Sequence, residues 1–126
     1  MGVPVNKRIL CIDDSQDNCE LLSFILSEAG YEIESAQSLI GGLQMARSNE
    51  FQLYLIDLSF RDGSGMDLIE KIRKFDAVTP IVVCSGEVRE AVQAEAISRG
   101  AQAFIIKPIE PDAFAQTIIE VLNSES

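Results

Sequence analysis

Four apolar runs in this chain each end in a polar residue that can take part in chemistry. If these runs are neighbouring parallel strands, their carboxyl ends meet at one edge of the sheet, which is where open α/β folds bind ligands. The runs are residues 9–12, 53–56, 81–84 and 104–106, and the residues that follow them are Asp13 with Asp14, Asp57, Ser85 and Lys107. The sequence therefore predicts a crevice that holds three carboxylates, a hydroxyl and an ammonium group.

Strand-like and helix-like segments alternate along the chain. Strand runs begin near residues 8, 32, 53, 81 and 103, a recurrence of roughly 20–30 residues that is close to the size of a βαβ unit. Amphipathic helices are expected over residues 17–28, 38–48, 66–75, 89–99 and 112–122. Five strands that alternate with five helices predict an α/β fold, a doubly wound parallel sheet with both faces covered.

The second strand run indicates the order of the strands. Residues 31–36 alternate between polar and apolar side chains and end in no reactive group, which is typical of a half-exposed edge strand. The order 2-1-3-4-5 of a flavodoxin-like (βα)5 fold places this strand at an edge and sets strands 1 and 3 side by side. Asp13, Asp14 and Asp57 would then meet at the switch point of the sheet.

Local signals mark several element ends. Asp17 with Glu20 three residues on resembles a capping box at the start of the first helix, and Gly30 is suited to ending it. Pro111 is expected in the first turn of the last helix. Residues 62–65, Asp-Gly-Ser-Gly, predict a turn and a flexible loop after Asp57.

Composition narrows the class of protein. The 126 residues favour one domain, 1–126, with a core over about 7–122, and the net charge of −10 argues against binding to nucleic acid or to an anionic membrane. No apolar stretch approaches the ~20 residues of a membrane helix. The three cysteines lack metal-ligand spacing and indicate a reducing compartment, so a cytoplasmic location is expected. Histidine is absent, which excludes His-based triads.

Each polar strand terminus has an ordinary alternative explanation. Aspartate and serine are common in turns, and Lys107 could extend from a strand end towards solvent. Their joint position at four strand ends is more informative than any one of them. Three close carboxylates repel one another unless a cation compensates, and Mg²⁺ prefers carboxylate and carbonyl oxygens. The sequence therefore predicts a site for Mg²⁺ and a phosphoryl group.

With this set of residues, the chain resembles the receiver domain of two-component response regulators, of the single-domain chemotaxis-regulator type, from about Lys7 to Leu122. The resemblance implies that Asp57 accepts a phosphoryl group, with Lys107 and Ser85 in contact with it. It also implies a partner, either a sensor histidine kinase or a phosphotransfer protein. The domain would catalyse only its own phosphorylation and dephosphorylation, and its output partner or domain is not indicated.

The same resemblance implies a metal site and a conformational switch. Asp14 would bind Mg²⁺ directly, Asp13 mainly through water, and Asp57 and the backbone carbonyl of Ser59 would complete the protein ligands. Ser85 and Phe104 would be the switch residues and would change the face formed by the fourth helix, the fifth strand and the fifth helix. A cis peptide bond between Lys107 and Pro108 is also implied.

The chain departs from the family pattern after the phosphoacceptor. Arg61 stands where many members have proline, so this loop is expected to be more mobile. The switch hydroxyl is serine rather than threonine, the aromatic residue is Phe104 rather than tyrosine, and Gly86 leaves open access to the phosphoryl group, which suggests rapid dephosphorylation.

Two other functions remain open on the sequence. A Mg²⁺-dependent aspartyl phosphatase also uses an aspartate and a lysine, but its Asp-x-Asp spacing is absent at Asp13-Asp14-Ser15. A pseudo-receiver would bind partners without being phosphorylated, and the complete set of acids, hydroxyl and lysine argues against it.

Overall fold

The computed structural model describes residues 7–124. Seven strands are assigned there: β1 (Arg8–Ile12), β2 (Glu32–Ala36), β3 (Leu53–Ile56), β4 (Ser59–Phe60), β5 (Gly63–Ser64), β6 (Ile81–Ser85) and β7 (Ala103–Ile106). The helices of this region are α1 (Gln16–Glu28), α2 (Leu39–Ser48), α3 (Gly65–Phe75), α4 (Glu90–Arg99) and α5 (Pro111–Ser124). Among these described elements, no helix has the length and apolar character needed to cross a membrane.

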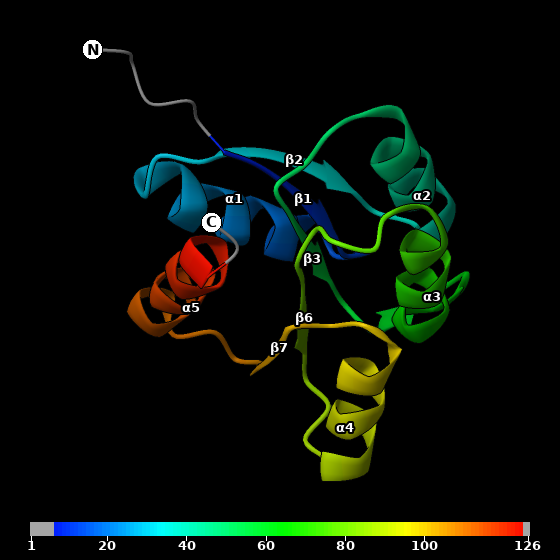
Figure 1. The fold of residues 1–126 in the computed structure, drawn as a ribbon. Coiled ribbons are helices and arrows are strands. Elements are labelled where there is room, and N and C mark those ends of the chain that lie inside the picture. Colours follow the sequence, from blue (N-terminus) through cyan, green and yellow to red (C-terminus); the bar gives the residue numbers. More distant parts are fainter. Residues whose placement is uncertain (1–6, 125–126) are drawn as a thin grey trace.

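Five of the strands form one parallel sheet in the order β2-β1-β3-β6-β7 (Figure 1). Counted along the chain, this is the predicted order 2-1-3-4-5, and the predicted fold class is confirmed. The half-polar strand β2 lies at an edge, as its alternation indicated. In register, Ile12 at the end of β1 is flanked by Ala36 on one side and Ile56 on the other.

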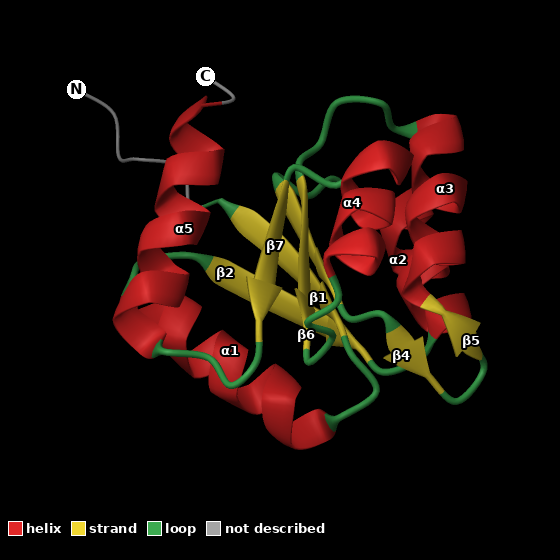
Figure 2. Cartoon of the chain, turned by 90° about the horizontal axis from the view of Figure 1, so that it is seen from below, coloured by secondary structure: helices red, strands yellow, loops and turns green. Residues whose placement is uncertain are grey.

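Helices cover both faces of this sheet. Helices α1 and α5 lie on one face and α2, α3 and α4 on the other (Figure 2). Because successive side chains of a strand point to opposite faces, Ile9 packs with the α1 and α5 side chains and Leu10 with those of the opposite layer. Every residue of β3 and β6 is buried. Each fully buried Leu or Ile contributes about 1.5–3 kcal/mol to the stability of the fold. The two central strands therefore give a stable position to the residues that follow their carboxyl ends.

The start of α1 differs from the prediction. Ser15, in an extended conformation, is the N-cap, and its Oγ accepts a hydrogen bond from the backbone N–H of Asn18 at 3.2 Å. The capping box at Asp17 is therefore wrong, because Asp17 already lies in the first helical turn. The two other predicted ends are confirmed: Gly30 has φ 97° just after α1, and α5 begins at Pro111.

The segment after Asp57 is more regular than the flexible loop that the sequence predicted. Ser59 pairs with Ser64 and Phe60 with Gly63, which makes a short antiparallel hairpin, β4–β5 (Figure 2). Phe60 packs against the core, and the φ of 147° at Gly63 allows the tight turn. The hairpin thus joins the end of β3 directly to α3.

A buried tyrosine supplies a test of how tightly β3 is held. The Tyr54 hydroxyl donates to Asp76 Oδ2 at 3.2 Å, and burial together with the Asp76 charge raises the pKa of Tyr54 above its usual 10.0. The stability that this protonated phenol contributes is present below about pH 10 and is lost as the pH rises towards the folded pKa. In a Tyr31→Phe variant, which leaves Tyr54 as the one tyrosine, the tyrosinate absorbance should appear with a midpoint well above pH 10. A midpoint at or below pH 10 would contradict this account.

Candidate functional site

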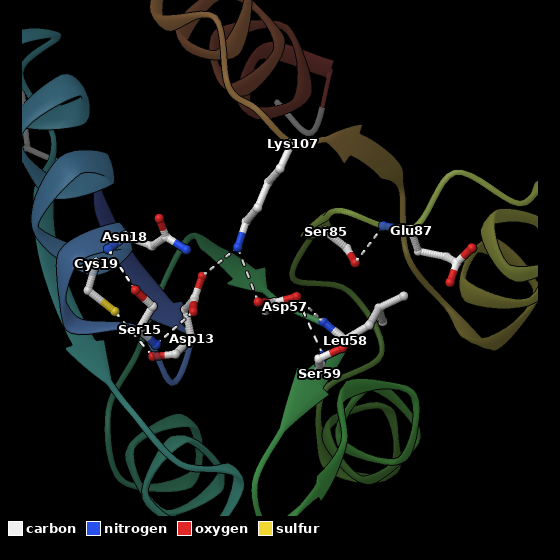
Figure 3. Close-up of polar contacts among 10 residues, drawn as sticks. All are labelled: Asp13, Ser15, Asn18, Cys19, Asp57, Leu58, Ser59, Ser85, Glu87 and Lys107. Carbon is white, nitrogen blue, oxygen red and sulfur yellow. Dashed lines mark hydrogen bonds and ion pairs between the residues drawn. The ribbon is translucent and has the colours of Figure 1, made fainter.

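The carboxyl ends of β1, β3 and β7 bring two carboxylates and an ammonium group together. Lys107 Nζ lies 3.0 Å from Asp13 Oδ2 and 3.1 Å from Asp57 Oδ2 (Figure 3). These contacts join residues 94 and 50 positions apart in the chain. The predicted meeting of Asp13, Asp57 and Lys107 at one edge of the sheet is therefore present in the structure.

The charges of this cluster support one another. Asp13 is 2% exposed, and a buried carboxylate requires a charge or hydrogen-bond partner. Burial alone lowers the pKa of Lys107, but its hydrogen bond to Asp13 and the charge of Asp57 outweigh that effect and raise the pKa above its usual value. Lys107 consequently remains an ammonium group at neutral pH and offsets the repulsion between the two carboxylates.

The remaining carboxylate oxygens are held by backbone groups. Asp57 Oδ1 accepts from the N–H of Leu58 at 2.7 Å and of Ser59 at 3.5 Å, and Asp13 Oδ1 accepts from the N–H of Ser15 at 2.9 Å (Figure 3). The Asp57 side chain is 12% exposed. Asp57 is therefore fixed in orientation and still reachable from solvent.

One surface hollow of about 380 Å³ contains the predicted metal ligands. It is lined by Asp13, Asp14, Ser15, Asn18, Asp57, Ser59, Phe60 and Arg61. Asp14 is exposed and makes no hydrogen bond or ion pair with any residue that the structure describes. Over residues 7–124, no group of three or more Asp, Glu, Cys or His side chains is arranged so that it could hold a metal ion. The acids therefore line one hollow without forming a complete coordination site.

A second hollow of about 460 Å³ lies on the other side of Asp57. Its lining residues are Asp57, Leu58, Ser59, Ser64, Met66, Ser85, Gly86, Glu87 and Val92. Ser85 is buried, and its Oγ accepts a hydrogen bond from the Glu87 N–H at 3.2 Å (Figure 3). The structure thus places the predicted hydroxyl beside Asp57 without a hydrogen bond between them, in a hollow of suitable size for a phosphoryl group.

Phe104 lies apart from both hollows. It is half-buried in β7, opposite Val83 in β6, and packs against the core on the side of α2, α3 and α4. The expected cis peptide bond between Lys107 and Pro108 is present.

Sequence reasoning missed two residues around the site. Glu87 lines the second hollow, and its bidentate ion pair with Arg89 lowers the pKa of Glu87 to about 2. Gly65 packs against the backbone of Asp57 and Leu58, where a Cβ atom would lie 2.9 Å from Leu58 Cα. Glu87, two residues after Ser85, and Gly65, directly after the N-cap Ser64, can be noticed in the sequence. Only the fold shows that both lie at the site.

Comparison with known proteins agrees with this geometry. The family model described as the response regulator receiver domain matches residues 9–119, and the chain belongs to that family. It is 32% identical to chemotaxis protein CheY from Thermotoga maritima over 97% of this chain and 99% of that protein. A CheY-like response regulator receiver domain protein from Methanospirillum hungatei JF-1 has 30% identity and a TM-score of 0.92, with 96% of this chain and 97% of that one covered.

The chain also matches part of a longer protein. Transcriptional regulatory protein ZraR from Klebsiella oxytoca is 27% identical over 90% of this chain, which corresponds to 26% of that protein. The chain is thus a receiver domain of two-component signalling, and it is similar to CheY over nearly its whole length.

Proposed function

We propose that this receiver domain is a signalling switch that accepts a phosphoryl group on Asp57 from a sensor histidine kinase or a phosphotransfer protein. The observation that carries the proposal is the position of Asp57 between the two hollows, with Lys107 Nζ 3.1 Å from its Oδ2. One hollow offers oxygen ligands and the other a hydroxyl, on either side of one accessible carboxylate.

The transfer needs a nucleophile and stabilisation of charge. An Asp57 oxygen attacks phosphorus, the bond from phosphorus to the donor histidine nitrogen breaks, and the electron pair stays with the imidazole. Lys107 lies beside the attacking carboxylate and donates to a phosphoryl oxygen as the charge redistributes. Ser85 lines the adjacent hollow. Its Oγ accepts from the Glu87 N–H, which leaves the hydroxyl hydrogen to be donated to a second phosphoryl oxygen.

The donor set fits Mg²⁺. Asp13, Asp14, Asp57 and the backbone carbonyl of Ser59 are hard oxygen ligands, and all four residues line one hollow. The open arrangement suits an ion that keeps several waters rather than one enclosed by protein. Bound there, Mg²⁺ would supply positive charge that stabilises the phosphoryl oxygens.

Phosphorylation is proposed to change the surface formed by α4, β7 and α5, through which the domain controls its output partner. A bound phosphoryl group would draw the Ser85 hydroxyl inward and move the loop before α4. This movement would make room for Phe104 to repack against Val92, since both side chains pack against the same core cluster. Ile97 on α4 and Ile106 on β7 are 47% and 42% exposed, so apolar surface is already available on this face. Phosphorylation would shift the population between two packings of it.

The test of the proposal is the intact mass of the protein after incubation with acetyl phosphate. With Mg²⁺ present, we expect the gain of one phosphoryl group, and with a chelator present we expect none. No gain with either acetyl phosphate or a panel of phosphorylated kinases would contradict the proposal and favour a pseudo-receiver. Release of inorganic phosphate from stable phosphate esters would favour a phosphatase instead.

A further inference from the structure

One cationic residue lines the acidic hollow beside Asp57, and the proposed reaction does not explain its role. Arg61 lines this hollow together with Asp13, Asp14 and Asp57. It is exposed, and its guanidinium makes no hydrogen bond or ion pair with any residue between 7 and 124. Because Arg61 pairs with none of the three carboxylates that line the same hollow, its guanidinium is available to another anion.

The hairpin holds Arg61 at a defined place. Arg61 and Asp62 form the turn between the paired strands β4 and β5. The Asp62 Oδ1 atom accepts a hydrogen bond from the backbone N–H of Leu39 at 3.3 Å, which ties the turn to the first residue of α2. Phe60, on the other side of Arg61, packs against the core. The backbone at Arg61 is thus anchored on both sides while its side chain stays free.

Charge explains why such a residue is useful here. A phosphodonor brings its own negative charge up to Asp57, which borders the acidic hollow with its three carboxylates, and like charges repel. Lys107 is already engaged with Asp13 and Asp57. Among the residues that line this hollow, Arg61 is the one with a positive charge. A guanidinium also presents a planar fork of donors that matches two oxygens of a phosphoryl group.

We propose that Arg61 binds the phosphoryl group of the incoming donor and so sets the concentration of donor that the domain needs. The inference rests on the proposed role of Asp57 as the phosphoacceptor. With acetyl phosphate as donor, the bond from Asp57 to phosphorus forms, the bond from phosphorus to the acetate oxygen breaks, and acetate leaves with that electron pair. Arg61 contacts the phosphoryl oxygens in the donor complex and takes no part in bond making.

The experiment measures the rate of phosphorylation as a function of acetyl phosphate concentration, at fixed Mg²⁺. Arg61→Gln is expected to raise the half-saturating donor concentration about fivefold, the effect of one charge-assisted hydrogen bond at an exposed site. The maximal rate should stay within about twofold, because the groups that act on phosphorus are unchanged. Arg61→Lys, which keeps the charge but loses the fork, should fall between the two.

Lys74→Gln is the matched control. It removes one positive charge from an exposed position on α3, outside the hollow, so its half-saturating concentration should equal that of the wild type. If Arg61→Gln and the wild type saturate alike, or if Arg61→Gln lowers only the maximal rate, the assignment of Arg61 is overturned while the role of Asp57 stands. If the wild type takes up no phosphoryl group from any donor, the proposed function itself fails.

Discussion

An Asp57→Asn variant is expected to take up no phosphoryl group from acetyl phosphate under conditions in which the wild type gains one. The amide keeps the shape of the side chain and an oxygen that can accept from the Leu58 N–H, which now bonds Asp57 Oδ1 at 2.7 Å. It lacks the negative charge that makes a carboxylate oxygen a nucleophile. The comparison therefore removes the chemistry and leaves the local backbone contacts in place.

The measurement is the intact mass of both proteins, followed by peptide mapping of the modified wild type. Asp17→Asn is the control, because it makes the same chemical change at an exposed position in the first turn of α1. That variant should be phosphorylated like the wild type. An Asp57→Asn protein that still gains one phosphoryl group would show that another residue is the acceptor.

A Gly65→Ala variant is expected to lose about 3 kcal/mol of unfolding free energy, the range of a steric clash with atoms that cannot move away. A Cβ atom at Gly65 would overlap the backbone carbonyl oxygen of Asp57 and lie 2.9 Å from Leu58 Cα. The Gly65 N–H also donates to the Leu58 carbonyl at 2.9 Å. Relief of the clash requires α3 to move from the end of β3, which breaks this contact and displaces Asp57.

Urea denaturation gives the loss directly, and the melting temperature should fall by roughly 10 °C for a domain of this size. Gly86→Ala is the matched control, since a Cβ there would meet no atom within 4 Å, and its stability should stay within about 0.5 kcal/mol of the wild type. Because Asp57 is displaced, Gly65→Ala should also be phosphorylated more slowly than the wild type. A Gly65→Ala protein as stable as the control would contradict the close packing of α3 on this loop.

The parallel sheet and the cluster of Asp13, Asp57 and Lys107 could both be predicted from the sequence, for the same physical reason. The apolar runs and the polar residues that end them are local patterns, and in a parallel sheet the strand ends must meet at one edge. Asp13, Asp57 and Lys107 could therefore be brought together before any distance was known. The start of α1 was misplaced because both Ser15 and Asp17 are suitable caps, and only the backbone conformation at Ser15 distinguishes them.

What the sequence by itself determined is the alternation of five strands and five helices, the edge position of β2 and the identity of the groups at the sheet edge. These follow from hydrophobic periodicity, which each segment carries alone. Only the tertiary structure decided that Asp57 borders two hollows, that Arg61, on an anchored hairpin, lines the acidic one, and that Gly65 packs against the Asp57 backbone. Those facts depend on how helices and turns distant in the chain pack against one another, and no local pattern encodes such contacts.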